Sequence, residues 1–78
     1  MNNKSLKIYP LYFEEVIKGN KKAELRFNDR DFKVGDIYDL KEFNGDYTGR
    51  FITIRITHIL DGFVGLFDGW CMFSFEII

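Results

Sequence analysis

The stretch GNKKAELRFNDRDFKVGD, residues 19–36, contains the point at which the chain changes from a helical to an extended pattern. Up to Ile17, apolar residues recur at the spacing of a helix, and Gly19 supplies the left-handed residue that commonly ends one. From Ala23 to Phe27, apolar residues alternate with charged ones, which is typical of a half-buried strand. We therefore expect a short helix before Gly19 and a strand after it, with the apolar residues of that strand on its buried face.

The same stretch gathers positive charge. Between Lys18 and Lys33 it holds six basic and three acidic residues, although the whole chain has a net charge of -1 at pH 7. Generic nucleic-acid coat proteins usually carry a large positive excess, and this chain does not. The local excess therefore indicates either a solvated hairpin or a local binding site for an anion.

The size and composition indicate a single domain, residues 1–78, with a small aromatic core. A chain of this length buries only about 60% of its unfolded surface, so most of its nine Phe, four Tyr and one Trp are expected inside. Cys71 is the only cysteine, and no stretch has the length of a signal peptide or a membrane span. We expect a cytoplasmic protein without membrane contact. One His and one Cys without ligand-like spacing predict no metal site, and no cofactor is expected.

The remaining pattern predicts a mainly β protein. Pro10 suits the first turn of a helix that runs to about Ile17, and Asn-Gly at residues 44 and 45 is a good hairpin signal. We expect strands at about residues 6–9, 23–27, 34–43, 51–60 and 70–77. One or two short helices with about five or six strands give an α+β fold. Closure into a small β-barrel would protect the strand edges.

The bend after the helix and the alternating strand hold the candidate binding residues. Gly19 permits close approach of the backbone to a ligand, and Lys21 adds a compact positive charge. Alternation places Lys22, Glu24 and Arg26 on one face, with the carboxylate about 7 Å from each cation and able to orient both. This arrangement suits a phosphate or the polar edge of a base. A solvated ladder of surface charges gives the same pattern.

Four residues of the stretch fill every position of the pattern G-x-K-x-x-E-x-R, and in this the chain resembles the ASCH family of small PUA-like domains. The similarity continues through NDRDFKVGD, YTGR and ITHILDG, covers nearly the whole chain, and looks most like a short bacterial and phage-type branch of undefined role. The resemblance implies a PUA-like β-barrel with a cleft between the first helix and the barrel, which is the cleft proposed for RNA binding in relatives. Lys22 and Arg30 carry charge but belong less firmly to the motif. The candidate RNA- or nucleotide-binding residues are Gly19, Lys21, Lys22, Glu24, Arg26 and Arg30.

Three functions remain open on the sequence. The leading one is a module that binds RNA or a nucleotide-like ligand, with Lys21 and Arg26 on a phosphate or a base edge. The second is a small amidohydrolase that removes an acyl group from modified cytidine, as some ASCH relatives do, with Lys21 and Glu24 as general acid and base. Those enzymes pair the lysine with a threonine, whose place in the motif holds Glu24 here. The loss of that hydroxyl nucleophile favours a role without catalysis.

The third function is protein interaction through FVGLFDGW, residues 63–70. This segment is rich in bulky apolar residues for a stretch with several glycines. We favour a packed lid over one end of the barrel above a contact surface for a second copy of the chain. We accordingly expect a monomer or a weak homodimer.

Overall fold

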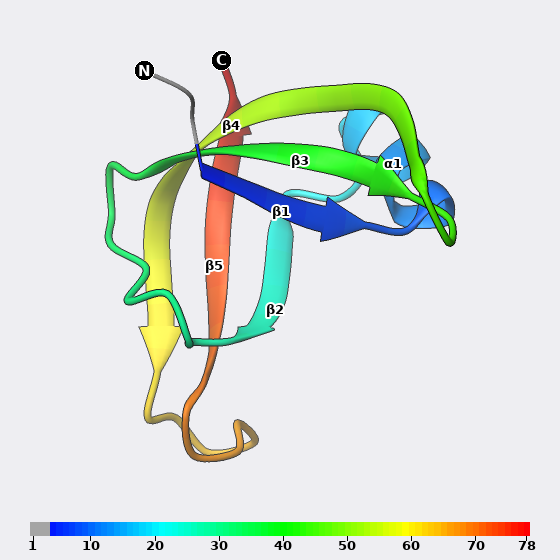
Figure 1. Ribbon diagram of the computed structural model, residues 1–78. Coiled ribbons are helices and arrows are strands. Elements are labelled where there is room, and N and C mark those ends of the chain that lie inside the picture. The colour runs from blue at the N-terminus through cyan, green and yellow to red at the C-terminus, as the bar shows by residue number, and fades with distance from the viewer. Residues whose placement is uncertain (1–3) are drawn as a thin grey trace.

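Five strands form one sheet, and a helix follows the first strand (Figure 1). The elements are β1 (Lys4–Ile8), α1 (Pro10–Ile17), β2 (Ala23–Phe27), β3 (Ile37–Phe43), β4 (Tyr47–Asp61) and β5 (Trp70–Ile77). They come from a computed structural model that describes residues 4–78. The strand order β1-β3-β4-β5-β2 places the first two strands of the chain at opposite edges of the sheet. β1 runs parallel to β3, and the other neighbouring strands are antiparallel.

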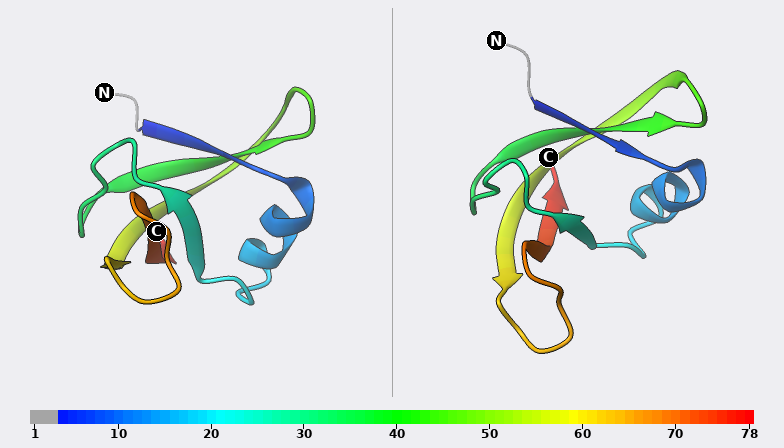
Figure 2. Two further views of the ribbon diagram at one scale, coloured as in Figure 1. Left: turned by 90° about the horizontal axis from the view of Figure 1, so that it is seen from below. Right: turned by 60° about the horizontal axis from the view of Figure 1, so that its bottom comes forward.

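The helix predicted from the apolar spacing is confirmed as α1. Tyr9 before it is extended, Pro10 occupies the first turn, and Gly19 follows the helix with a φ of +79°. The side chains of Phe13 and Val16 are fully buried. Because α1 connects the end of β1 to the start of β2, it lies at the open side of the sheet (Figure 2).

β4 is the strand that gives the sheet its curvature. It has 15 residues, pairs with β3 along its first part and with β5 along its second, and shifts register between Ile56 and His58. Figure 1 shows it bending from the top of the molecule down one side. The sheet therefore curls into a half-barrel, and the mainly β, α+β class predicted from the sequence is confirmed.

The concave side of the half-barrel holds an apolar core. Its members come from α1, from the loop after β2 and from four of the strands, and they are Leu6, Ile8, Phe13, Val16, Phe32, Tyr38, Leu40, Ile54, Ile56, Cys71, Phe73 and Phe75. These include only five of the 14 aromatic residues. The expectation that most aromatic side chains are core is therefore wrong. Eight of the others are more than a third exposed, which leaves aromatic surface available for contacts with another molecule.

Besides β1, which begins at Lys4 rather than at about residue 6, two strands begin at other residues than predicted. The strand expected from Val34 begins at Ile37, because residues 33–36 form a turn in which Asp36 N donates to Lys33 O and Lys33 N donates to the Asp36 carboxylate. The strand expected from Phe51 begins at Tyr47, since the chain reverses within Asn44–Asp46 and pairs again at once. Both errors concern turns, where local hydrogen bonds decide the backbone path.

The sheet is not closed into a barrel by strand pairing. Among residues 4–78, β1 and β2 are edge strands that do not pair with each other. Two arginines cross the gap between them: Arg26 Nη2 donates to Lys7 O at 2.6 Å, and Arg30 Nη1 donates to Ser5 O at 2.7 Å. These guanidinium groups satisfy carbonyls of β1 that a neighbouring strand would otherwise bind. The half-barrel is thus bridged by side chains rather than by a sixth strand.

The segment FVGLFDGW does not form the packed lid that the sequence favoured. Phe63, Val64 and Phe67 are 60%, 93% and 82% exposed, and only Leu66 of the loop is half-buried. The loop extends from the end of the half-barrel between β4 and β5 (Figure 1). The prediction of a lid is wrong because these side chains project away from the core. In the part of the chain that the structure describes, no helix has the length and apolar character to cross a membrane.

Candidate functional site

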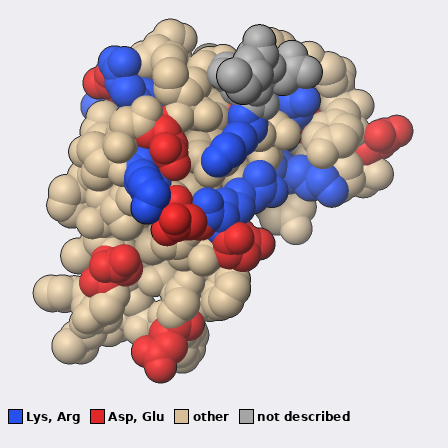
Figure 3. All heavy atoms as spheres, turned by 60° about the vertical axis from the view of Figure 1, so that its left-hand side comes forward, with Lys and Arg blue, Asp and Glu red and all other residues tan. Residues whose placement is uncertain are grey.

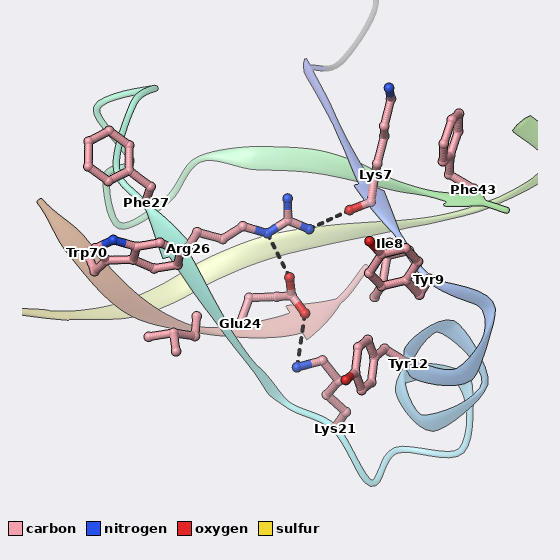
Figure 4. A pocket seen from close by; sticks show the side chains of 11 residues that line it. Lys7, Ile8, Tyr9, Tyr12, Lys21, Glu24, Arg26, Phe27, Phe43 and Trp70 are labelled. Atoms are coloured by element: carbon pink, nitrogen blue, oxygen red, sulfur yellow. Dashed lines mark hydrogen bonds and ion pairs between the residues drawn. The ribbon is translucent and has the colours of Figure 1, made fainter. Parts of the chain in front are cut away.

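A cleft of about 710 Å³ lies where the two edge strands and α1 come together (Figure 4). Its walls combine a few charged side chains with several aromatic rings, which come from the end of β1, α1, β2, the end of β3 and the start of β5. The lining residues are Lys7, Ile8, Tyr9, Tyr12, Lys21, Glu24, Leu25, Arg26, Phe27, Phe43 and Trp70. Three of the predicted site residues, Lys21, Glu24 and Arg26, are among them.

Glu24 is the buried polar centre of the cleft. The residue is only 6% exposed, Lys21 Nζ lies 3.0 Å from its Oε1, and Arg26 Nε donates to its Oε2 at 2.8 Å. A buried carboxylate needs such compensation, because removing its partners would leave a buried charge unpaired. The three side chains therefore form one ion-paired unit. The alternative of a solvated charge ladder is wrong for Glu24.

The prediction about which face of β2 is buried is also wrong. Glu24 is paired across the sheet with the fully buried Phe73, whereas Leu25 is paired with Met72 on the opposite face. Leu25 and Phe27 are 56% and 51% exposed. Directly paired residues share a face of a sheet, so the charged residues of β2 face the concave side and its apolar residues face outward. The alternation was correct, but the assignment of its two faces was inverted.

Lys21 and Arg26 are held by further contacts. Lys21 Nζ donates to Ala23 O at 2.6 Å and lies 5.6 Å from the centre of the Tyr12 ring. Arg26 Nη2 donates to Lys7 O, whereas Arg26 Nη1 forms no hydrogen bond within residues 4–78 (Figure 4). The cleft therefore presents a positioned guanidinium with one unused donor nitrogen beside a fixed carboxylate.

Aromatic rings flank this polar centre on both sides. Tyr9 and Tyr12 lie with their ring centres 6.3 Å apart, and Phe27 meets Trp70 edge-on at 6.0 Å. Phe43 lies beside Lys7, whose Nζ is 4.3 Å from the centre of the ring (Figure 4). Exposed rings beside hydrogen-bonding groups can hold a flat heterocycle by stacking while its polar edge is bound.

The other predicted site residues do not line this cleft. Gly19 ends α1 and donates its N–H to Val16 O, so its role is in the turn. Lys22 is exposed, and its carbonyl accepts from Phe75 N. Arg30 lines a second hollow of about 480 Å³, together with Lys4, Ser5, Lys7, Arg26 and Tyr47.

Sequence reasoning missed most of the cleft wall. Lys7, Tyr9 and Phe43 were not singled out, and no local pattern distinguishes them from surface or core residues. Tyr12 was assigned only to the helix pattern, although it is 47% exposed and faces the cleft. The signal that could have found them is the excess of aromatic residues over what a small core holds.

A second buried carboxylate, Glu42, fixes the wall that carries Tyr12. Arg50 Nε and Nη2 donate to its two oxygens at 2.9 and 2.7 Å, and Thr48 Oγ1 donates at 2.6 Å. Arg50 Nη2 also reaches Glu14 of α1 at 2.7 Å. The hydrogen bonds from Arg50 and Thr48 lower the pKa of Glu42 to about 2, and Glu42 raises the pKa of Arg50. Thr48 and Arg50 belong to the YTGR segment, so that part of the sequence serves to anchor α1.

Nothing in residues 4–78 forms a metal site, since no three His, Cys, Asp or Glu side chains come together there. Within the described residues 4–78, the lining of the cleft contains no Ser, Thr or Cys. Its chemistry is therefore that of ion-paired donors, one carboxylate and aromatic surface. Such a set is suited to holding a polar, planar ligand.

Comparison with known proteins finds relatives of undefined role. Residues 3–75 match the model of a family described as a domain of unknown function, DUF3850. An uncharacterised 12.9 kDa protein in the GpA 3′ region of Escherichia phage P2 is 40% identical over 57 residues, which are 72% of this chain and 52% of that protein. The chain thus spans about half the length of the curated relative that it matches.

Proposed function

The chain belongs to the DUF3850 family, and from the cleft of its half-barrel we propose that it binds RNA or a nucleotide-like ligand. The observation that carries this proposal is a buried carboxylate between two cations in a cleft with exposed aromatic walls. A buried carboxylate beside exposed aromatic rings is suited to an unstacked base of a single-stranded nucleic acid. It is poorly suited to a duplex, whose accessible face is broad and shallow.

In this proposal each group has a separate role. A base stacks on the exposed ring of Tyr12 or Tyr9, which for a single-stranded nucleic acid contributes about 1–3 kcal/mol per base. Arg26 Nη1 donates to an acceptor on the ligand, and Lys21 supplies positive charge. Glu24 keeps both cations in place and accepts from an amino group that comes within reach. The ion-paired unit is therefore a preformed recognition edge.

The ASCH resemblance and a PUA-like fold are part of the same proposal. They are supported by the half-barrel and by the positions of Lys21, Glu24 and Arg26, which line the cleft next to the first helix. Gly19, the remaining residue of the motif, ends that helix and sets the path of the chain into β2.

The amidohydrolase is less well supported. In the part of the chain that the structure describes, the residues that line the cleft offer no Ser, Thr or Cys as a nucleophile. Lys21 Nζ donates to Ala23 O and is paired with Glu24, so this amine is already engaged as a hydrogen-bond donor. Purified protein is therefore expected to leave a panel of acylated cytidines unhydrolysed over hours, as followed by chromatography. Turnover that is lost in Lys21→Ala would establish the enzyme instead.

The binding proposal is tested by fluorescence anisotropy of labelled single-stranded RNA of random sequence. Wild type is compared with Lys21→Ala/Arg26→Ala, and Lys18→Ala/Lys33→Ala is the matched control because it removes two exposed lysines outside the cleft. We expect the cleft variant to bind at least tenfold more weakly and the control to bind within about threefold of wild type. For about three phosphate contacts, log affinity should fall with log salt at a slope of about -2.

A third variant separates the cleft from simple charge attraction. Tyr12→Ala keeps every charge but removes a stacking surface, and it should weaken binding by about fivefold or more. Circular dichroism and the unfolding midpoint confirm that each variant is folded. Equal weakening by the cleft pair and the control pair, or affinity without salt dependence, would show that the cleft is not the binding site.

A second candidate function rests on the exposure of the loop at residues 62–69. Val64 and Phe67 are largely exposed, which favours the contact surface for a second copy over the lid. Sedimentation velocity over a hundredfold range of concentration should show a weak dimer that Val64→Ser/Phe67→Ser abolishes. A monomer at every concentration would remove this candidate.

A further inference from the structure

The hollow that Arg30 lines adjoins the cleft and has a different character. Its lining consists of Lys4, Ser5, Lys7, Arg26, Arg30 and Tyr47, so four of six residues are basic and none is acidic. Such a concentration is unexpected in a chain with a net charge of -1. Figure 3 shows Lys and Arg side chains running together over one face of the molecule, beside several acidic ones.

The cleft and the hollow share two residues. Lys7 and Arg26 line both, so a ligand can extend from one into the other. Lys7 Nζ lies 4.3 Å from the centre of the Phe43 ring, and Phe43 lines the cleft but not the hollow. A charge over a ring at the junction of the two spaces is well placed to meet a phosphate attached to a stacked nucleoside.

The cations of the hollow are positioned yet only partly neutralised. Arg30 Nη1 donates to Ser5 O, while its Nε lies 4.0 Å from an Asp29 oxygen, a distant and exposed pair. The side chain of Lys4 forms no salt bridge or hydrogen bond within residues 4–78. Arg26 is the only one of the four with a buried carboxylate partner. The hollow therefore keeps most of its positive charge available to an anion.

We propose that this basic hollow holds the phosphate next to the nucleoside that occupies the cleft. The ligand is then a nucleotide or a single strand of RNA, and a free nucleoside, which lacks the phosphate, should bind more weakly. This inference rests on the proposed function, because the cleft must first hold a base. The shared chemistry is a phosphate monoester or diester, which a mononucleotide and an RNA strand both carry.

The experiment compares wild type with Lys4→Gln/Arg30→Gln, with Lys18→Gln/Lys33→Gln as a matched control of equal charge change. Lys4→Gln alone is included because Arg30 also contacts β1, whereas the exposed side chain of Lys4 forms no salt bridge or hydrogen bond within residues 4–78. The probes are a labelled eight-nucleotide RNA of random sequence, the four ribonucleoside 5′-monophosphates and the four ribonucleosides. Affinities are measured by anisotropy, directly or by competition, at several salt concentrations.

The expected result is about tenfold weaker RNA binding for the double variant and about threefold for Lys4→Gln. The salt slope should be smaller in magnitude by about 1.4 for the two lost contacts. Nucleoside affinity should remain within twofold of wild type in every variant. Monophosphates that bind as tightly as the RNA would identify a free nucleotide as the ligand, and tighter binding of the RNA would identify a strand.

Two outcomes would overturn the inference, and they differ from each other. If the double variant and the control pair bind RNA equally well while Tyr12→Ala does not, the cleft binds a base and the hollow binds no phosphate. If wild type binds neither RNA nor any nucleotide or nucleoside, the proposed function fails, and the inference fails with it.

Discussion

Gly69 is the residue whose replacement should show most directly how the cleft wall is built. Its φ is +83°, and a Cβ there would lie 2.7 Å from Cε1 of Phe27, which meets Trp70 edge-on. We expect Gly69→Ala to lower the free energy of unfolding by about 1–2 kcal/mol from backbone strain alone. Displacement of the Phe27 ring should add to that loss and shift the fluorescence of Trp70, the only tryptophan.

The matched control for this prediction is Gly65→Ala. Gly65 also has a positive φ, +99°, but its added Cβ would have no atom within 4 Å from any described residue other than its chain neighbours. It therefore carries the backbone strain without the contact. Urea unfolding of both variants, followed by fluorescence, should show the larger loss and a spectral shift only for Gly69→Ala. Equal losses with unchanged spectra would mean that the ring of Phe27 does not pack as described.

At the same scale, the sequence was informative about the polar site residues and uninformative about the aromatic ones. Glu24 and Arg26 were grouped by the alternation of one strand, and Lys21 by its place at the bend before that strand and in the pattern G-x-K-x-x-E-x-R. Tyr12 and Phe43 reach the cleft from a helix and from the end of another strand. No local pattern could say that these rings are exposed, because the same residue types fill the core.

Among the elements, helix and strand positions followed from periodicity, but the exposure of their faces did not. α1, β2 and β5 were predicted at the residues where they occur. The alternation of β2 was also correct, yet its charged face lies on the concave side of the sheet, where Glu24 forms ion pairs with Lys21 and Arg26. Apolar residues of an edge strand can remain outside when ion pairing satisfies the other face, and hydrophobicity alone predicts the opposite.

The loop between β4 and β5 gives a prediction at the scale of an element. Val64 and Phe67 are 93% and 82% exposed, so Val64→Ser/Phe67→Ser removes almost no buried area. We expect the free energy of unfolding of dilute protein to change by less than about 0.5 kcal/mol. Chemical denaturation at micromolar concentration measures this, and Phe73→Ser in the core is the contrast. A loss of several kcal/mol in the loop variant would show that the loop is covered in solution.

For the whole molecule, the arrangement of strands lay beyond local pattern. The parallel pairing of β1 with β3 and the separation of β1 from β2 depend on residues far apart in the chain. The sequence led us to expect a closed barrel, and the structure has a half-barrel instead. Arg26 and Arg30 donate to carbonyls of β1 at the edge where a further strand would pair. The opening left between the edge strands is also the place where the cleft forms, so incomplete closure and the candidate site have one cause.

The ion-paired network of Glu42 joins three elements and makes the stability of the whole molecule depend on pH. Arg50 of β4 binds Glu42 of β3 and Glu14 of α1. The pKa of Glu42 is lowered from 4.5 to about 2, chiefly by the hydrogen bond from Arg50. A carboxyl whose pKa is lower in the folded state stabilises the fold above its unfolded pKa, and this contribution is lost as pH falls through the folded value. Wild type should therefore lose stability between about pH 4.5 and 2.

Glu42→Gln tests this prediction because it removes the titrating group but keeps an acceptor for Arg50 and Thr48. Over the same pH range, unfolding of wild type should take up as much as one proton more than unfolding of the variant, because Glu42 becomes protonated only in the unfolded state. The stability of wild type should therefore fall more steeply with acid. Glu76→Gln is the matched control, since it breaks an exposed pair with Arg55 that should contribute little. Urea unfolding at pH 7, 4.5, 3.5 and 2.5 gives the slopes. Parallel slopes for wild type and Glu42→Gln would mean that folding does not lower the pKa of Glu42, and this would contradict the ion-paired network through which Arg50 reaches α1.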